Sequence, residues 1–406
     1  MRLALVNHLH PDSPLVGAAR LREFAHALAR RGHHVVLLTE AIAGREGDEP
    51  ATLVARLAEH DWTRPLMVST RARRVPLLDA LRQGRLPRPL RALVIAGLYL
   101  ARGGVFPDWS LGVAPLLPVL AGHFRPQAVW GTFGNTDAWI IARSLARRAG
   151  CPWVMDVKDK WDVFIPAPLR AYLAWRFNDA ARLTALARSY LDHVRPRFSC
   201  PGTVIYSGVS QALLDQPAHG AAEDRLTLSG STYSPATLSA VMAGIAGAVR
   251  PGTIFTYAGT DHRQVAEAAR SLPCAVDIRG QLPQDELVAL QRPSFANLYC
   301  CIGDHDRFHS KLIELLCVGR PILCLPPDGP EADSIARQVT GDFTGCATPE
   351  DLARALSQAW DRRQAPVPAD GERLAAYGWD GQAALLEEVF EQVIPPNRRT
   401  EFSVRR

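Results

Sequence analysis

The sequence predicts an α/β protein that contains two doubly wound domains in tandem. Short apolar runs alternate with helical patterns along the chain, and this alternation is typical of parallel sheets flanked by helices. The series stops at a polar, small-residue stretch, 210–224, and then begins again. The length of 406 residues also exceeds the size at which a single hydrophobic core usually stops growing.

The first domain is predicted to span residues 1–209. A buried strand over 2–9 leads through a loop containing Gly17 into a helix, and a second strand follows that helix. A strand over 127–134, a helix and a strand over 152–157 repeat the unit. This order of elements is that of a parallel sheet with crossover helices.

The second domain is predicted to span residues 225–364, after a linker over 210–224. About five short apolar runs in this domain are separated by helical or polar segments. Residues 365–406 carry one more helix, which we expect to pack back toward the N-terminal domain, and a polar tail. Open parallel sheets bind ligands at the carboxyl ends of their strands, so we expect the two domains to face a central cleft.

The composition is that of a globular protein, with 47% hydrophobic and 21% charged residues and a net charge of +5. The eight cysteines show no CxxC spacing, so we expect reduced core thiols, no metal site and a cytoplasmic location. No apolar run reaches the roughly 18 residues of a membrane-spanning helix. The apolar part of the N-terminus is too short for a signal peptide.

Residues 71–102 are strongly basic and surround the apolar run 92–101, "ALVIAGLYLA". One interpretation is a solvated helix face beside a core helix. The other is a surface that docks peripherally on the inner face of a membrane, since basic and apolar side chains together bind anionic lipid headgroups. Nucleic acid is not an expected partner, because no stacking aromatics interleave with the arginines.

Lysine is rare in this chain, which has three lysines and 43 arginines. Lys311 lies in "HSKLIELLCVG", where Ser310 can cap a helix and place the lysine in its first turn. A cation there opposes the helix dipole, but it suits an anion bound in front of the helix. Glu314 lies one turn further on and could accept hydrogen bonds from sugar hydroxyls. An ordinary i, i+3 ion pair with Lys311 is the alternative for Glu314.

The loop "HPDSPLVG", which ends at Gly17 ahead of a helix, is a second candidate phosphate-binding loop. It lacks the GxGxxG pattern of dinucleotide-binding loops. A tight turn between a strand and a helix could also require glycine for structural reasons alone.

The segment "SKLIELLCVGRPILCLPPDGPEADSI" resembles the C-terminal-domain motif of family 4 glycosyltransferases. These are retaining nucleotide-sugar enzymes with the GT-B fold, which consists of two Rossmann-like domains. Asp306 and Glu314 stand at the positions of the two acids of the family motif, with Asp306 in place of the usual first Glu. Five further segments are similar to family elements and occur in the same order: the first 39 residues, "VMDVKDKWD", "VIYSGVS", "DIRGQLPQDEL" and "YGWDGQAALLEEVF".

The resemblance implies a role for each matching residue. Lys311 would meet the donor diphosphate and Asp306 the transferred sugar, and these two would be the catalytic residues. Glu314 would bind the ribose. The remaining donor-binding candidates are Gly17, Gly230, Ser231, Thr232, Gly259, Gly280, Leu282 and Ser310. The acceptor-side candidates are Thr132, Gly134, Asn135, Lys158 and Asp159.

The chain also departs from the family pattern. No Arg or Lys follows "LTLSG", and "WGTFGNTDAW" lacks the histidine often found beside the donor sugar. The expected function is retaining, hexosyltransferase-like transfer from a nucleotide-diphosphate sugar to a glycan, lipid-linked or small-molecule acceptor, without a cofactor. Two alternatives stay open: a non-catalytic or regulatory nucleotide-sugar-binding protein of the same fold, and an epimerase or pseudo-glycosyltransferase.

Overall fold

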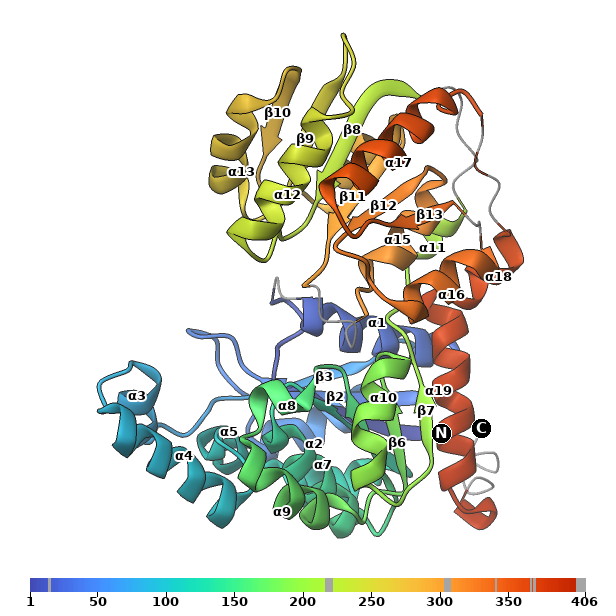
Figure 1. Ribbon diagram of the computed structural model, residues 1–406. Coiled ribbons are helices and arrows are strands. Elements are labelled where there is room, and N and C mark those ends of the chain that lie inside the picture. The colour runs from blue at the N-terminus through green and yellow to red at the C-terminus, as the bar shows by residue number, and fades with distance from the viewer. Residues whose placement is uncertain are drawn as a thin grey trace. The chain divides into compact units, whose positions relative to one another are not determined.

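The computed structural model describes residues 1–13, 16–215, 222–302, 308–339, 342–365, 367 and 370–398. The chain divides into two compact units. The N-terminal unit comprises Met1–Ser207 and Trp379–Arg406, and the C-terminal unit comprises Gly208–Gly378. Each unit is built on its own parallel sheet (Figure 1).

The sheet of the N-terminal unit has seven parallel strands in the order β3-β2-β1-β4-β5-β6-β7. These strands are β1 (Arg2–Val6), β2 (His34–Glu40), β3 (Leu66–Thr70), β4 (Ala128–Phe133), β5 (Trp153–Val157), β6 (Arg182–Ala185) and β7 (Gly202–Val204). The central strands are buried along almost their whole length, as strands covered on both faces should be.

Helices cover both faces of this sheet. They are α1 (Val16–Arg30), α2 (Pro50–Glu59), α3 (Pro76–Arg82), α4 (Arg88–Arg102), α5 (Pro107–Val113), α6 (Leu116–Val119), α7 (Thr136–Ala149), α8 (Trp161–Phe164), α9 (Ala167–Phe177), α10 (Arg188–Val194) and α19 (Trp379–Val393), with short turns η1 (Leu120–Phe124) and η2 (Arg195–Arg197). The last helix, α19, packs against α1: Leu386 and Phe390 join Phe24 in the same hydrophobic core.

The C-terminal unit has a six-stranded parallel sheet in the order β10-β9-β8-β11-β12-β13. Its strands are β8 (Glu223–Ser229), β9 (Ile254–Ala258), β10 (Ala275–Arg279), β11 (Ser294–Cys300), β12 (Ile322–Leu325) and β13 (Phe343–Gly345). Its helices are α11 (Gln211–Leu214), α12 (Pro235–Ala246), α13 (His262–Ala268), α14 (Gln284–Gln291), α15 (Lys311–Val318), α16 (Pro330–Val339), α17 (Pro349–Asp361) and α18 (Gly371–Ala376), with the turn η3 (Ala269–Ser271).

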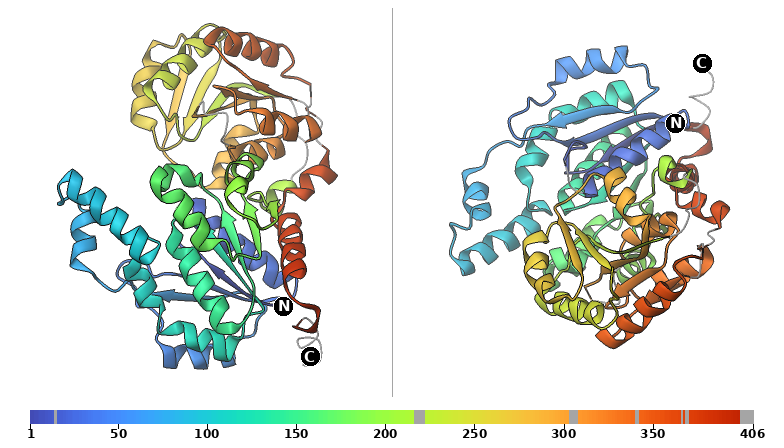
Figure 2. Two further views of the ribbon diagram at one scale, coloured as in Figure 1. Left: turned by 60° about the horizontal axis from the view of Figure 1, so that its bottom comes forward. Right: turned by 90° about the horizontal axis from the view of Figure 1, so that it is seen from above.

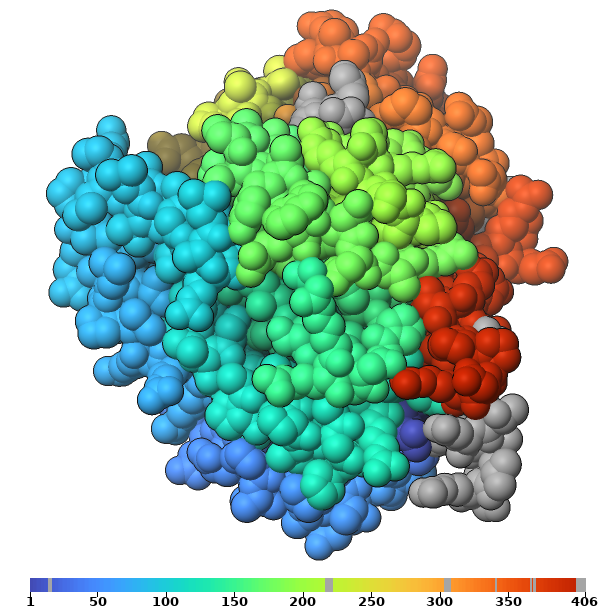
Figure 3. Space-filling model, turned by 90° about the horizontal axis from the view of Figure 1, so that it is seen from below, coloured from blue at the N-terminus to red at the C-terminus, as the bar shows by residue number. Residues whose placement is uncertain are grey.

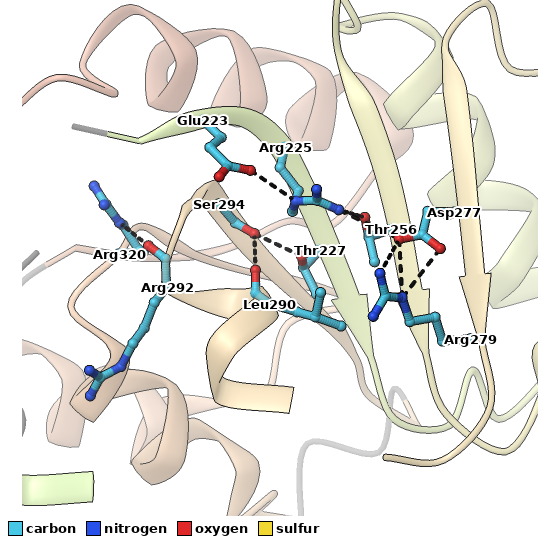
Figure 4. A network of polar contacts seen from close by, with 10 residues as sticks. All are labelled: Glu223, Arg225, Thr227, Thr256, Asp277, Arg279, Leu290, Arg292, Ser294 and Arg320. Carbon is cyan, nitrogen blue, oxygen red and sulfur yellow. Dashed lines mark hydrogen bonds and ion pairs between the residues drawn. The ribbon is translucent and has the colours of Figure 1, made fainter. Parts of the chain in front are cut away.

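A ladder of polar side chains crosses the edge of this second sheet (Figure 4). The Arg225 guanidinium donates to the Thr256 hydroxyl at 2.6 Å and lies 3.6 Å from the Asp277 carboxylate. Arg279 pairs with the same carboxylate at 3.0 Å. Charged side chains on an edge strand such as β10 discourage pairing with another chain.

Several segments differ from the sequence prediction. Strand β3 and strand β13 were not expected, because they are only five and three residues long. The predicted linker over 210–224 contains helix α11, and β8 begins in it. The catalytic candidate Asp306 lies outside the described residues.

Helices α3 and α4 stand away from the sheet of the N-terminal unit (Figure 2). Helix α4 ends at Gly103, whose φ of 84° is in the left-handed region that glycine tolerates. Most of α4 is exposed, including Leu93 at 69% and Leu100 at 52%. The interpretation of residues 92–101 as a core helix is therefore wrong, because only Tyr99 of α4 is buried.

Candidate functional site

Each unit has a point at which the order of its strands reverses. In the N-terminal unit β1 lies between β2 and β4, and in the C-terminal unit β8 lies between β9 and β11. In open parallel sheets the loops that follow the two strands at such a point diverge, and ligands bind at the carboxyl edge there. The predicted site residues fall largely into two groups, one at each of these points.

Lys311 and Gly230 meet at the switch point of the C-terminal unit. Lys311 begins α15, after β11, and Gly230 follows β8. A Cβ atom built on Gly230 would lie 3.0 Å from Lys311 Cε and 3.1 Å from Nζ. Gly230 also has φ 89°, a left-handed conformation that requires glycine. The glycine thus lets the ammonium approach the loop backbone closely.

Lys311 and Glu314 are half-buried, and no ion pair or hydrogen bond joins these two described residues. Burial lowers the pKa of Lys311, and the nearby Glu314 carboxylate opposes that shift. Burial likewise raises the pKa of Glu314, and Lys311 opposes that shift. The i, i+3 ion pair considered for Glu314 is therefore not formed, and both charged groups remain available to a ligand.

Ser310 does not cap α15, contrary to the prediction. Its φ of −57° and ψ of −19° are already helical, and its side chain makes no capping hydrogen bond. An N-cap residue needs an extended backbone to aim its hydroxyl at the N–H groups of the first turn. The amides at the start of α15 are therefore not occupied by this serine.

The loop that follows Gly230 is held by its neighbours. The Thr232 amide and hydroxyl both donate to the Asp261 carboxylate, at 2.7 and 3.0 Å. The Tyr257 hydroxyl donates to the Gly230 carbonyl at 2.7 Å. The Thr232 amide is thus already engaged, and the Gly230 amide donates to the Ala258 carbonyl at 2.9 Å. The Ser231 amide is therefore the better diphosphate candidate. The sequence did not point to Asp261 because a single Asp in a loop carries no distinctive pattern.

The other donor-binding candidates of the C-terminal unit differ in how strongly the structure constrains them. A side chain on Gly259 would collide with the Tyr257 hydroxyl and approach the Gly230 carbonyl to 2.5 Å. Gly280 is exposed, with open space where a Cβ would lie, and Leu282 is half-buried. Gly259 therefore has a packing role beside the loop, whereas nothing nearby requires glycine at position 280.

Sequence reasoning missed a buried cluster beside Lys311. The Asp328 carboxylate lies 2.5 Å from His309 Nδ1 and accepts a 2.8 Å hydrogen bond from the Tyr299 hydroxyl. Together with Cys301, His309 and Asp328 place three potential metal-ligand atoms within 4.8 Å of one another. These residues come from three separate parts of the sequence, so their spacing gave no metal signal. Both carboxylate oxygens already have protein partners, so the cluster is internally satisfied.

A second group forms at the switch point of the N-terminal unit. The Lys158 ammonium occupies the space that a Cβ on Gly17 would fill, and it lies 3.4 Å from the Cβ position of Gly134. Lys158 is only 6% exposed. The structure therefore brings together a donor-side candidate, Gly17, and two acceptor-side candidates.

The remaining acceptor-side candidates have other surroundings. The Asn135 side chain accepts a hydrogen bond from the Asp137 amide and caps α7, so it has a structural role. Thr132 is fully buried, and its hydroxyl has no hydrogen-bond partner among the described residues. Asp159 is half-buried.

Arg20 and Asp156 form a buried ion pair beneath this second group. Arg20 Nη2 lies 3.4 Å from Asp156 Oδ1 and donates to the Ile205 carbonyl at 2.9 Å. The Thr184 hydroxyl donates to the same carboxylate at 2.8 Å. Asp156 was noticed only as part of a motif, and Arg20 is one of many arginines, so the pair could not be read from the sequence.

Asp137, at the start of α7, is fully buried and accepts a 2.9 Å hydrogen bond from the Phe106 amide. Burial raises the pKa of Asp137 to about 6, although the Phe106 hydrogen bond opposes the shift. The fold therefore favours the protonated form. Stability from this group is fully present below the unfolded pKa near 3.8 and is lost as the pH rises through about 6.

We expect Asp137→Asn to remove this pH dependence. Between pH 4 and pH 7.5 the wild type should lose about 2.4 kcal/mol of stability relative to the variant. Urea unfolding at several pH values measures the difference. Asp192→Asn, at an exposed position on α10, is the control and should follow the wild type. A parallel pH profile for Asp137→Asn and wild type would contradict the prediction.

Solved structures of the same fold match the chain over nearly its whole length. A glycosyltransferase from Rickettsia africae ESF-5 is 12% identical with a TM-score of 0.63, and the match covers 97% of this chain and 98% of the other. HepE from Anabaena, in complex with UDP and glucose, is 12% identical with a TM-score of 0.61 over 96% and 99%. The trehalose-6-phosphate phosphatase N-terminal domain from Candida albicans is 9% identical with a TM-score of 0.62 over 96% of each chain.

No family model matches the sequence, and no curated protein matches it. At such low identities the likeness to solved structures concerns the fold alone. It confirms the predicted fold class, an α/β protein with two Rossmann-like units of the GT-B type.

Proposed function

We propose that the protein is a nucleotide-sugar glycosyltransferase, in which the C-terminal unit binds the donor. The finer proposal, from the resemblance of residues 310–335 to family 4, is a retaining hexosyltransferase. The acceptor is a glycan, a lipid-linked precursor or a small molecule that the N-terminal unit binds. HepE, one of the proteins of similar fold, binds UDP-glucose, so a uridine nucleotide is the first donor to test.

One observation carries the proposal. Lys311 lies at the switch point of the C-terminal sheet, against the Gly230 backbone, and no described residue pairs with its ammonium. It also begins α15, where a lysine opposes the helix dipole and does not stabilise the helix by itself. A bound diphosphate would satisfy both the ammonium and the first amides of that helix.

The chemistry supported by this arrangement is mainly electrostatic. When the bond between sugar and diphosphate breaks, negative charge grows on the diphosphate. Lys311 is placed to stabilise that charge, as preorganised cationic groups do for other anionic transition states. Glu314, half-buried one turn further along α15, would accept hydrogen bonds from the ribose. No metal is needed in this scheme, although the Cys301, His309 and Asp328 cluster lies nearby.

The experiment that tests the proposal is thermal unfolding of the wild type with UDP, GDP, ADP and dTDP. A nucleotide at about 100 times its dissociation constant should add roughly 2.7 kcal/mol of stability. Acceptor-dependent release of the matching diphosphate from its sugar nucleotide would then separate transfer from epimerisation and simple binding. No stabilisation by any of the four nucleotides would contradict the proposal. Stabilisation without release, across a panel of acceptors, would favour a regulatory binding protein.

We also propose that the N-terminal unit docks on the cytoplasmic face of an anionic membrane through α3 and α4. Residues 71–102 hold eight arginines and a single acid, Asp79. Exposed apolar side chains lie among them: Leu77, Leu90, Leu93 and Leu100, with Trp175 of the adjacent α9 at 74% exposure. In the space-filling view this region forms the left edge of the molecule (Figure 3).

The lengths of these helices favour binding at the membrane surface over spanning the membrane. Arg88–Val113 is the one stretch of the described chain whose length and apolar content reach those of a membrane span. The left-handed Gly103 divides it into α4 and α5, of 15 and seven residues, whereas a span needs about 20. A short amphipathic helix with arginines beside a leucine stripe can instead lie in the headgroup region.

We expect the protein to co-sediment with phosphatidylglycerol vesicles and not with phosphatidylcholine vesicles, with binding weakened by salt. Leu93→Asp should abolish this binding, because it places a charge where a leucine would enter the headgroup region. Val163→Asp is the matched control: Val163 is 58% exposed but lies on α8, outside the basic region. Equal binding of both variants, or equal binding to the two lipids, would contradict the docking proposal.

A further inference from the structure

We propose that the N-terminal unit contains a subsite for an oxyanion of the acceptor, a phosphate or a carboxylate, centred on Lys158. The assignment of this anion to an acceptor rests on the proposed transferase function. The anion site itself rests on the geometry around Lys158. The subsite lies at the switch point between β1 and β4, the edge of the N-terminal sheet at which ligands of such sheets bind.

The first observation is a buried cation that lacks a bonding partner. Lys158 is 6% exposed, and no described residue accepts a hydrogen bond from its ammonium. Buried charges in proteins are normally paired, because an unpaired one loses its hydration without compensation. Desolvation accordingly lowers the pKa of Lys158, although the carboxylates of Asp159 and Asp156 oppose the shift. An external anion would supply the missing partner.

The second observation is the position of two helix N-termini around the same ammonium. Gly17 is in the first turn of α1, a 15-residue helix with no acid in that turn. Gly134 directly precedes Asn135, the residue that caps the 14-residue α7. The positive ends of two helix dipoles therefore converge with a lysine, and all three favour a negative charge.

The glycines explain how the ammonium reaches this place. A side chain on Gly17 would fill the position of Lys158 Nζ, and one on Gly134 would come within 3.4 Å of it. The ammonium is thus cradled between two stretches of backbone. A compact ammonium needs less room in such a cradle than the broad planar guanidinium of arginine. This accounts for a lysine in a chain that otherwise uses arginine for 43 of its 46 basic residues.

Among the described residues, none of the nearby acids forms an ion pair with the Lys158 ammonium. Asp156 Oδ1 is engaged by Arg20 at 3.4 Å and by the Thr184 hydroxyl at 2.8 Å, whereas its Oδ2 has no hydrogen-bond partner among the described residues and attracts the ammonium only electrostatically. Asp137, in the first turn of α7, accepts hydrogen bonds from the Phe106 amide and the Ser110 hydroxyl. Asp159 attracts the ammonium electrostatically, but no ion pair joins these two described residues.

The test uses the full chain with UDP at saturation, so that the donor site is filled. Thermal unfolding is followed during titration with inorganic phosphate and, separately, with acetate, at ionic strength held constant with chloride. We expect phosphate, acetate or both to stabilise the wild type. In Lys158→Met the apparent affinity for the effective anion should fall by at least about tenfold, the loss expected for a charged hydrogen bond.

Three comparisons make the test specific. The affinity for UDP should be the same in Lys158→Met and in the wild type, because the donor diphosphate is assigned to Lys311. Lys160→Met, which removes the neighbouring lysine, should keep the anion effect. Without any ligand, Lys158→Met should melt at a higher temperature than the wild type, because it removes a desolvated ammonium from which no described residue accepts a hydrogen bond. A merely structural lysine would give the opposite change in melting temperature.

The outcomes separate this proposal from the proposed function. A wild type that binds UDP but responds to neither anion, or a Lys158→Met variant that responds fully, would overturn the subsite and leave the donor site intact. If Lys158→Met weakens UDP as strongly as it weakens phosphate, the cradle belongs to the donor diphosphate, and the acceptor subsite is wrong. A wild type that binds no nucleotide but shows the Lys158-dependent anion effect would remove the transferase function and retain the anion site.

Discussion

Replacing Lys311 by alanine should weaken UDP binding by about tenfold to a hundredfold, because a charged hydrogen bond to the diphosphate contributes about 1.5–3 kcal/mol. Transfer should fall further, by about a hundredfold to a thousandfold, because charge on the diphosphate grows in the transition state. Binding of uridine, which has no phosphate, should not change. Isothermal titration calorimetry with UDP and with uridine measures the two binding affinities.

Arg263→Ala is the control for Lys311→Ala. It removes an exposed cation from α13 of the same unit and should leave UDP binding within about twofold. Lys311→Arg should recover only part of the lost affinity, because the space against Gly230 is fitted to an ammonium. Equal loss of UDP and uridine binding in Lys311→Ala would contradict a phosphate contact and indicate a general disruption of the unit.

The geometry also offers a variant that keeps the lysine and displaces it. In Gly230→Ala the new Cβ would meet Lys311 Cε and Nζ at 3.0 and 3.1 Å, and the residue would be strained at φ 89°. The end of the lysine side chain must then shift by a few tenths of an ångström, and the strained residue disturbs the loop. UDP binding should weaken in this variant, and the two changes should be less than additive when Lys311→Ala is combined with it, since both act on the same contact.

The largest effect on stability is expected from Arg20→Met. The change leaves the Asp156 carboxylate, which is fully buried, without its cationic partner. Removing one member of a buried ion pair costs about 3–5 kcal/mol. Urea unfolding followed by tryptophan fluorescence measures the loss well, because eight of the nine tryptophans belong to the N-terminal unit.

A matched control for Arg20→Met lies on the same helix. Arg30 pairs with Asp380 at 2.7 Å, but both side chains are more than half exposed. Arg30→Met should therefore cost no more than about 1 kcal/mol. If the two variants lose similar stability, burial does not govern the energy of the Arg20–Asp156 pair, and the prediction is wrong.

The sequence predicted a good part of this molecule. The fold class followed from the alternation of apolar runs and helical patterns, since buried parallel strands and their crossover helices each leave a clear local signature. Lys311 could be found because it is rare in the chain and lies in the first turn of a helix, where a lysine is unfavourable without an anion. Both signals are local, so neighbouring residues suffice to carry them.

Other features depended on residues that are far apart in the sequence. Lys158 lies 141 positions after Gly17 and 24 after Gly134, and only the parallel pairing of β1, β4 and β5 brings them together. Arg20 meets Asp156 for the same reason, and Asp328 meets His309 and Tyr299 through the loops that follow β11 and β12. Burial was equally hidden: α4 reads as apolar, yet most of its side chains are exposed.

The sequence by itself therefore determined the two doubly wound units and the lysine at the start of α15, because these arise from hydrophobic periodicity and from local helix electrostatics. Only the tertiary structure decided which charges are buried and which partners they have. The cost of an unpaired charge depends on the solvent and the atoms that surround it. Those surroundings come from every strand and helix that packs nearby, so the anion cradle at Lys158 exists only in the folded chain.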